Sequence, residues 1–154
     1  MTGPDLLIRT LAPADLAAMR GMLAMFGEAF AEPEAYAPGP SDDYLADLLG
    51  DRGFIAIAAL LGGEVVGGPA AYVLRKFEQE RSEIYIYDLA IAEAHRRRGM
   101  ATALIAEVQR IATERGAWVI FVQTDYVDPP AVALYEKLGR REQVLHFDID
   151  PAPR

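Results

Sequence analysis

Apolar residues recur along this chain with two spacings, one typical of helices and one typical of strands. Ser41 is a favourable N-cap for one of the helices. Proline and glycine between residues 32 and 40 predict a loop. The predicted helices cover residues 12–30, 41–49, 99–115 and 129–138. The predicted strands cover residues 6–10, 54–61, 64–74, 82–91, 117–123 and 143–149.

The order of these elements predicts the fold class. Gly62 and Gly63 separate two neighbouring apolar runs, which is a signal for a β-hairpin. A first half rich in hairpins, followed by strand-helix-strand crossovers, predicts an α/β fold: a mixed, mostly antiparallel sheet with helices on both faces. We expect residues 1–154 to form a single domain.

The strand that contains Tyr85 changes phase near its end. Glu83, Tyr85 and Tyr87 alternate with isoleucines, but Asp88 then stands where an apolar residue is due and Leu89 where a polar one is due. A β-bulge produces such a one-residue slip, so we predict a bulge that splays this strand from its neighbour. The alternative is an ordinary strand whose tyrosines pack and whose aspartate ends the exposed face.

A basic loop that contains glycine connects this strand to the next helix. Arg96, Arg97 and Arg98 bring three positive charges to a chain whose net charge is −8. Gly99 and Ala101 are small enough for backbone N–H groups to approach an anion, which the positive end of the helix dipole also attracts. The loop suits a pyrophosphate, although it is neither a dinucleotide fingerprint nor a Walker A sequence. The alternative is a solvated basic turn.

The composition excludes several kinds of site and partner. The chain has no cysteine and only two histidines. Disulfides, thiolate ligands and a cysteine nucleophile are therefore excluded, and we expect no metal. The acidic net charge disfavours nucleic acid and suits a small cationic substrate, although acidity for solubility alone explains it equally well. No apolar run approaches the ~18 residues of a membrane span, so we expect no membrane partner and a cytoplasmic location.

The basic loop and the last predicted helix resemble a known family. The pattern Arg96-x-x-Gly99-x-Ala101 matches the acetyl-CoA motif of the GNAT superfamily of N-acetyltransferases, and it stands between a strand and a helix as that family requires. The string Ala-Leu-Tyr-x-x-x-Gly around Tyr135 resembles the family's downstream motif, with Asp128 where asparagine is usual. The resemblance implies the GNAT fold, with its splayed and bulged fourth strand.

Within that superfamily the chain is most similar to the type I aminoglycoside 3-N-acetyltransferases, which acetylate gentamicin and fortimicin. This finer resemblance extends over nearly the whole chain. Its strings lie at residues 54–56, 70–74, 76–79, 82–90 and 146–151.

The resemblance also implies how acetyl-CoA is held. Backbone groups of the strand after the bulge would pair with the pantetheine like an added strand, and the basic loop would hold the pyrophosphate. Tyr135 would face the sulfur. The cofactor-binding residues implied are Leu89, Ala90, Ile91, Arg96, Arg97, Arg98, Gly99, Met100, Ala101, Thr102 and Tyr135.

The implied reaction is direct transfer of acetyl from CoA to an aminoglycoside amine, at the 3-N position, with antibiotic resistance as its consequence. A protonated amine must first lose a proton to a base. Asp88 is the preferred base and Glu83 the second candidate, while Tyr135 would protonate or stabilise the departing thiolate. Because the chain lacks cysteine, a ternary complex is favoured over an acyl-enzyme.

An aminoglycoside is polycationic, so we expect carboxylates to line its groove. Asp148 and Asp150 should share one face of the last predicted strand, and Asp125 follows the strand before it. Tyr85 and Tyr87 complete the predicted substrate-binding residues. Two alternatives stay open: acetylation of a polyamine or a protein lysine, and a CoA-binding module without turnover. We expect a homodimer.

Overall fold

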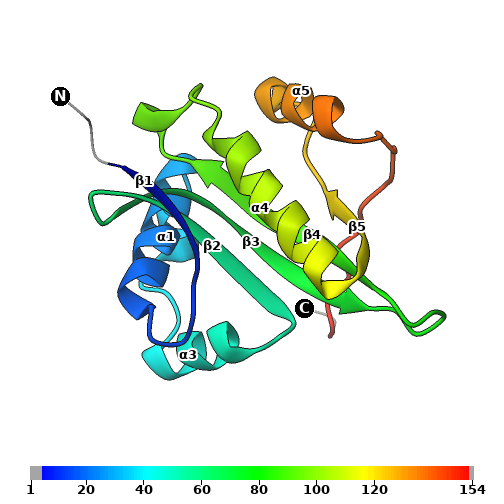
Figure 1. Ribbon diagram of the computed structural model, residues 1–154, viewed down its shortest axis with the longest axis horizontal. Coiled ribbons are helices and arrows are strands. Elements are labelled where there is room, and N and C mark those ends of the chain that lie inside the picture. Colours follow the sequence, from blue (N-terminus) through cyan, green and yellow to red (C-terminus); the bar gives the residue numbers. More distant parts are fainter. Residues whose placement is uncertain (1–4, 153–154) are drawn as a thin grey trace. The chain divides into compact units, whose positions relative to one another are not determined.

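The computed structural model describes residues 5–152, which divide into two compact units, one ending at Gln123 and the other beginning at Thr124 (Figure 1). The second unit holds one helix, α5 (Pro129–Leu138). None of the described helices is both long and apolar enough to cross a membrane. The first unit holds β1 (Leu6–Thr10), α1 (Leu16–Ala29), α2 (Pro33–Tyr36), α3 (Asp42–Gly50), β2 (Phe54–Leu61), β3 (Glu64–Arg75), β4 (Ser82–Ile91), the 3-10 turn η1 (Glu93–His95), α4 (Met100–Arg115) and β5 (Ala117–Val122).

The strands form one five-stranded sheet in the order β1-β2-β3-β4-β5. Neighbours from β1 to β4 are antiparallel, whereas β4 and β5 are parallel, because α4 returns the chain between them. Gly62 and Gly63 both have positive φ, 57° and 82°, in the turn between β2 and β3. The predicted hairpin and the predicted mixed, mostly antiparallel sheet are both confirmed.

Helices cover both faces of the sheet in the first unit, with α1 and α3 on one side and α4 on the other (Figure 1). Strand β2 is buried on both faces, and its successive residues pack against different helices. Ile57 packs in the core that contains Leu104 of α4, whereas its neighbour Ala58 packs with Phe26 of α1 and Leu45 of α3. Successive residues of a strand point to opposite faces, so one apolar strand serves two cores.

Two glycines let β3 approach its neighbours closely. A Cβ atom at Gly68 would overlap the carbonyl oxygen of Ile57 on β2. A Cβ atom at Gly67 would lie 2.6 Å from Cδ1 of Ile91, at the end of β4. Gly68 therefore allows β3 to lie close to β2, and Gly67 allows it to lie close to the end of β4.

Two predicted boundaries near the N-terminus are wrong. Helix α1 begins at Leu16 rather than at residue 12, because the Ala12 N–H donates to Oδ2 of Asp15 (2.8 Å) and closes a turn ahead of the helix. The predicted loop contains the single-turn helix α2, which begins at Pro33. A proline at this first position is already set for helical φ and has no N–H to leave unpaired.

The predicted starts of α3 and α5 and the predicted end of α5 are confirmed, whereas α3 ends one residue later than predicted, at Gly50. The Ser41 hydroxyl accepts the Tyr44 N–H (3.2 Å) at the start of α3. The Asp128 carboxylate accepts the Ala131 N–H (3.3 Å) at the start of α5. Gly139 follows α5 in an extended conformation rather than in the left-handed one common after a helix.

The strand predicted over residues 143–149 is wrong. These residues form no regular element, and no strand of the described chain pairs with them. Alternating side chains suit an extended chain, but a strand also needs a neighbour that supplies hydrogen bonds. Leu145, Phe147 and Ile149, the apolar half of the pattern, are exposed.

Candidate active site

The phase slip in the sequence is a β-bulge at Tyr87. Asp88 pairs with Ala70 of β3, and Ile86 pairs with the next residue, Ala71. Tyr87 is therefore an extra residue on β4 with no partner on β3. The bulge predicted between Tyr87 and Leu89 is confirmed.

The bulge places Tyr87 and Asp88 on the same face of the sheet, although they are consecutive. The Tyr87 ring meets the ring of Tyr85, while the Asp88 carboxylate meets α2. Ile86 and Leu89, on either side of this pair, pack instead in the core under α4. The predicted base therefore joins the tyrosines on the side of the sheet that carries α1 and α2.

Asp88 is half-buried and bonded to a tyrosine of α2. Its Oδ2 atom accepts a hydrogen bond of 3.1 Å from the hydroxyl of Tyr36. Burial raises the pKa of Asp88 above its ordinary value; Glu32 raises it further, and the Tyr36 hydrogen bond lowers it. A carboxylate with a raised pKa is a stronger proton acceptor, which suits a general base.

Tyr36 was not predicted from the sequence. Its ring packs against Phe26 and Phe30, with centroids 6.0 Å and 6.1 Å apart, and this packing fixes the hydroxyl beside Asp88. Burial, followed by the charge of Asp88, raises the pKa of Tyr36 far above its ordinary value, so the hydroxyl stays protonated and donates. The residue lies in a proline-rich stretch without periodicity, so no pattern in the sequence indicates this contact.

Glu83, the second predicted base, lies near the opposite end of β4. Its Oε1 atom accepts a hydrogen bond from Nε1 of Trp118 (3.1 Å) and lies 3.8 Å from Nζ of Lys76. At about 3.3 Å per residue, five residues place it roughly 16 Å from Asp88 along the strand. The structure does not bring the two predicted bases together.

Strand β4 continues past the end of its parallel partner. Strand β5 pairs with β4 only as far as Ile86 and Val122, whereas β4 continues to Ile91. Among residues 5–152 no strand covers this edge of residues 89–91. The Arg96 side chain reaches back to it, since its Nε donates to the Ile91 carbonyl (2.9 Å). The remaining edge can accept an extended ligand.

The basic loop leads into a helix start without a side-chain cap. Gly99 is the N-cap of α4 with φ of 76°, and the first turn carries no acidic residue. Arg97 also has a positive φ, 64°, and its side chain is exposed, as is that of Arg98. The N–H groups of residues 100–102 have no carbonyl within the helix to bond, and they form the positive end of the helix dipole. This geometry fits a phosphate group.

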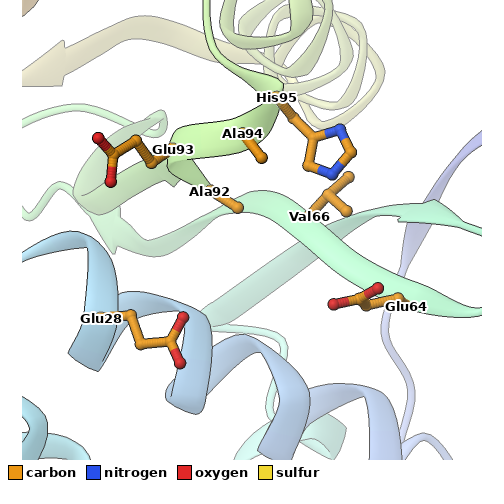
Figure 2. A pocket seen from close by; sticks show the side chains of 7 residues that line it. All are labelled: Glu28, Glu64, Val66, Ala92, Glu93, Ala94 and His95. Atoms are coloured by element: carbon orange, nitrogen blue, oxygen red, sulfur yellow. The ribbon is translucent and has the colours of Figure 1, made fainter.

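A pocket of about 450 Å³ lies beside this loop but suits a different ligand (Figure 2). Figure 2 shows Glu28 from α1, Glu64 from the start of β3 and His95 from η1 around the hollow. The Nδ1 atom of His95 is buried without a hydrogen-bond partner. Glu93 brings a third carboxylate to the lining, so the pocket would repel a pyrophosphate. No group of its side chains, or of others among residues 5–152, is placed to hold a metal ion.

The remaining predicted residues lie in the second unit. Tyr135 is on α5, and burial, followed by the charge of Asp128, raises its pKa to about 12. Asp125 is exposed in the turn before α5. Asp148 is exposed and its Oδ1 lies 2.8 Å from Nε2 of His146. Because residues 143–149 form no strand, the alternation argument no longer places Asp148 and Asp150 on a common face.

Comparisons with known proteins place this geometry in context. Residues 21–139 match the model of the acetyltransferase (GNAT) family. N-acetyltransferase 8B of Rattus norvegicus is 29% identical over 105 residues, which are 68% of this chain and 47% of that protein. The chain spans about half the length of the curated relatives that it matches.

Solved structures give a longer and stronger match. An aminoglycoside acetyltransferase from an uncultured soil metagenomic sample is 57% identical, with a TM-score of 0.93 over 96% of this chain and 99% of that chain. A second one from such a sample, in complex with sisomicin, is 32% identical, with a TM-score of 0.89 over 96% of this chain and 97% of that chain. It has also been solved with trehalose.

Proposed function

The chain belongs to the GNAT acetyltransferase family, and from this premise we propose that it transfers acetyl from acetyl-CoA to an amine of an aminoglycoside antibiotic. The observation that carries the proposal is the bulge, which sets a half-buried carboxylate, Asp88, directly before an uncovered strand edge. The metagenomic aminoglycoside acetyltransferase, similar over nearly its whole length, supports the acceptor class.

The uncovered edge and the basic loop would hold acetyl-CoA. Backbone groups of residues 89–91 would pair with the pantetheine, and the N–H groups of residues 100–102 would bind the pyrophosphate with Arg97 and Arg98. Arg96 would act from the base of the loop, where its Nε is already bonded to Ile91. Acetyl-CoA supplies an activated acetyl group as a thioester.

Asp88 would accept the proton that the ammonium group must lose before its nitrogen can attack. The new bond joins that nitrogen to the acetyl carbon, and the bond between this carbon and sulfur breaks. The hydroxyl of Tyr135, whose pKa of about 12 keeps it protonated at neutral pH, would donate to the departing thiolate. Glu83 is not needed for this scheme, since Trp118 and Lys76 already hold it.

The predicted substrate-binding carboxylates and tyrosines would bind the aminoglycoside. Tyr85 and Tyr87 adjoin Asp88, and the carboxylates of Asp125, Asp148 and Asp150 would attract ammonium groups. We further propose the 3-N position, a role in resistance, a homodimer and a cytoplasmic location, where acetyl-CoA is available. The complex of a similar enzyme with sisomicin supports a polycationic acceptor.

The test is a comparison of acceptors at fixed ionic strength, with release of CoA as the readout. Gentamicin, spermidine and a lysine peptide are all cationic amines, but they differ in shape. We expect gentamicin to have the highest kcat/KM, and NMR of the product to place the acetyl group on N-3. If spermidine or the peptide exceeds gentamicin by tenfold or more, the acceptor is wrong. If the protein binds acetyl-CoA but releases no CoA with any of the acceptors, it is a CoA-binding module without turnover.

A further inference from the structure

An unbroken row of aromatic side chains crosses four strands of the sheet. Phe54 of β2 pairs with Tyr72 of β3, Tyr72 pairs with Tyr85 of β4, and Tyr85 pairs with Phe121 of β5. Residues paired across strands point to the same face, so the four side chains share one face of the sheet. The sequence shows each aromatic residue alone but does not show this register.

The bulge adds a fifth ring to the row. Tyr87 meets the rings of both Tyr72 and Tyr85, with centroids 5.8 Å apart in each case. Its plane is almost perpendicular to that of Tyr72, at 88°. Tyr72 and Tyr87 therefore present two aromatic surfaces at a right angle, and Tyr87 directly precedes Asp88 in the chain.

The row begins in the core and ends on the surface. Phe54 is buried at 7% exposure, whereas Tyr72 is 37% and Tyr87 61% exposed. Burial, then Tyr87, Tyr44 and Asp88, raises the pKa of Tyr72, so the carboxylate is close enough for its charge to act on that ring. An exposed aromatic surface beside a half-buried carboxylate is not explained by packing of the core.

We propose that Tyr72 and Tyr87 form a stacking platform for the ring that carries the acceptor amine, and that this ring is a rigid aminocyclitol, the ring that carries N-3 in an aminoglycoside. The proposal rests on the proposed function and assigns a binding surface to it. Ammonium groups and the apolar C–H faces of a saturated ring both bind aromatic faces well. Two perpendicular surfaces restrict how the ring can turn, which holds one amine towards Asp88.

Charge and shape select this occupant. The charge of Asp88 acts on Tyr72, and Glu32 is close enough to act on Asp88. Their negative charge favours a positively charged guest over a phosphorylated one. A linear polyamine has the charge but no rigid ring to fill the right angle. The platform should therefore favour rigid rings that carry amines over flexible amines, a choice that charge alone does not make.

The test replaces the aromatic faces without removing a charge. Tyr87→Leu and Tyr72→Leu should each raise the KM for gentamicin by about 5- to 30-fold, since they remove a face that binds a cation. The KM for acetyl-CoA and the kcat/KM for spermidine should change less than twofold. Tyr87→Phe and Tyr72→Phe keep the rings and should keep the KM. Phe77→Leu, in the turn between β3 and β4 and 99% exposed, is the matched control.

Two results would overturn the platform: an unchanged KM for gentamicin in both leucine variants, or an equal loss with spermidine. If Tyr72→Leu fails to fold, the exposed Tyr87 carries the test. If the wild-type protein acetylates no aminoglycoside, the proposed function fails, and calorimetry with gentamicin then decides the platform separately. Binding that weakens in Tyr87→Leu would support the platform, and the absence of binding would refute it.

Discussion

The two ends of β4 carry one carboxylate each, and their surroundings differ. Near the first end Glu83 is bonded to Trp118 of β5 and close to Lys76, and the strand is paired on both sides. Near the second end Asp88 follows a bulge, Tyr36 bonds to it, and β5 no longer covers the strand. We call the end around Glu83 the closed end, because both neighbouring strands cover it, and the end around Asp88 the open end.

This difference shows how a sheet can expose backbone groups and a carboxylate at one place. A strand whose ladder is complete uses its polar side chains for pairing and packing. Where one ladder stops and a bulge adds a residue, backbone groups and a carboxylate become available at the same place. The experiments below ask whether the open end carries the chemistry and the closed end only stability.

The largest effect should come from replacing Asp88, compared with the matched replacement of Glu83. Asp88→Asn removes the proposed base, so we expect kcat to fall by about 10²- to 10⁴-fold. Glu83→Gln, the matched change at the closed end, should lower kcat less than about threefold, because Gln can still accept from Trp118. Single-turnover release of CoA measures both. Equal losses in the two variants would end the distinction between the ends.

The next effect concerns the loop after the open end. Gly99 has φ of 76°, and a Cβ atom there would meet only open space, so Gly99→Val acts through the backbone that shapes the helix start. Gly116, at the other end of α4, has nearly the same φ, 72°, and equally open space. Strain at either position is about 1–2 kcal/mol for a residue with a Cβ.

We expect Gly99→Val to raise the KM for acetyl-CoA by at least about tenfold, because it disturbs N–H groups that would bind phosphate. Gly116→Val should lose similar stability and leave that KM unchanged. Calorimetry with CoA and thermal melts separate the two effects. The same CoA affinity in both variants would remove the loop from the proposed site.

Much of the fold could be predicted because its signals are local. The Gly62-Gly63 turn, the Ser41 cap and the alternation that ends at Asp88 each need only neighbouring residues. The bulge is the clearest case, since a slip in side-chain phase is visible in the sequence before any partner strand is known.

Apart from the start of α1 and the short helix α2, the missed features depend on contacts between distant parts of the chain. Tyr36 lies 52 residues from Asp88, and Trp118 lies 35 residues from Glu83. The strand predicted over residues 143–149 has the right alternation but no strand to pair with in the described chain. Periodicity identifies a face, but it does not identify what covers that face.

A smaller effect should come from the hydrogen bond at the open end. That bond lowers the pKa of Asp88, so Tyr36→Phe should raise this pKa further. The acidic limb of kcat/KM should then move to higher pH, by about one unit or less for one hydrogen bond. Tyr44→Phe, which removes an exposed hydroxyl from α3, is the control. An unshifted limb with a lower kcat would mean that Tyr36 acts only through packing.

The smallest effect should be on stability, where changes to Asp88 and Glu83 should act in opposite directions. The pKa of Asp88 is higher in the folded protein than in an unfolded chain, so ionisation disfavours folding. This penalty is absent below the ordinary aspartate pKa of about 4 and reaches its full size above the folded pKa. Asp88→Asn should therefore raise Tm at pH 7 and leave it unchanged at low pH. Glu83→Ala should lower Tm at pH 7. The free energy of unfolding should fall by roughly 0.5–1 kcal/mol, the contribution of a partly exposed hydrogen bond and ion pair. Melting curves at both pH values test this contrast, and a loss of stability in Asp88→Asn at pH 7 would show that the open end, too, is held together by its carboxylate.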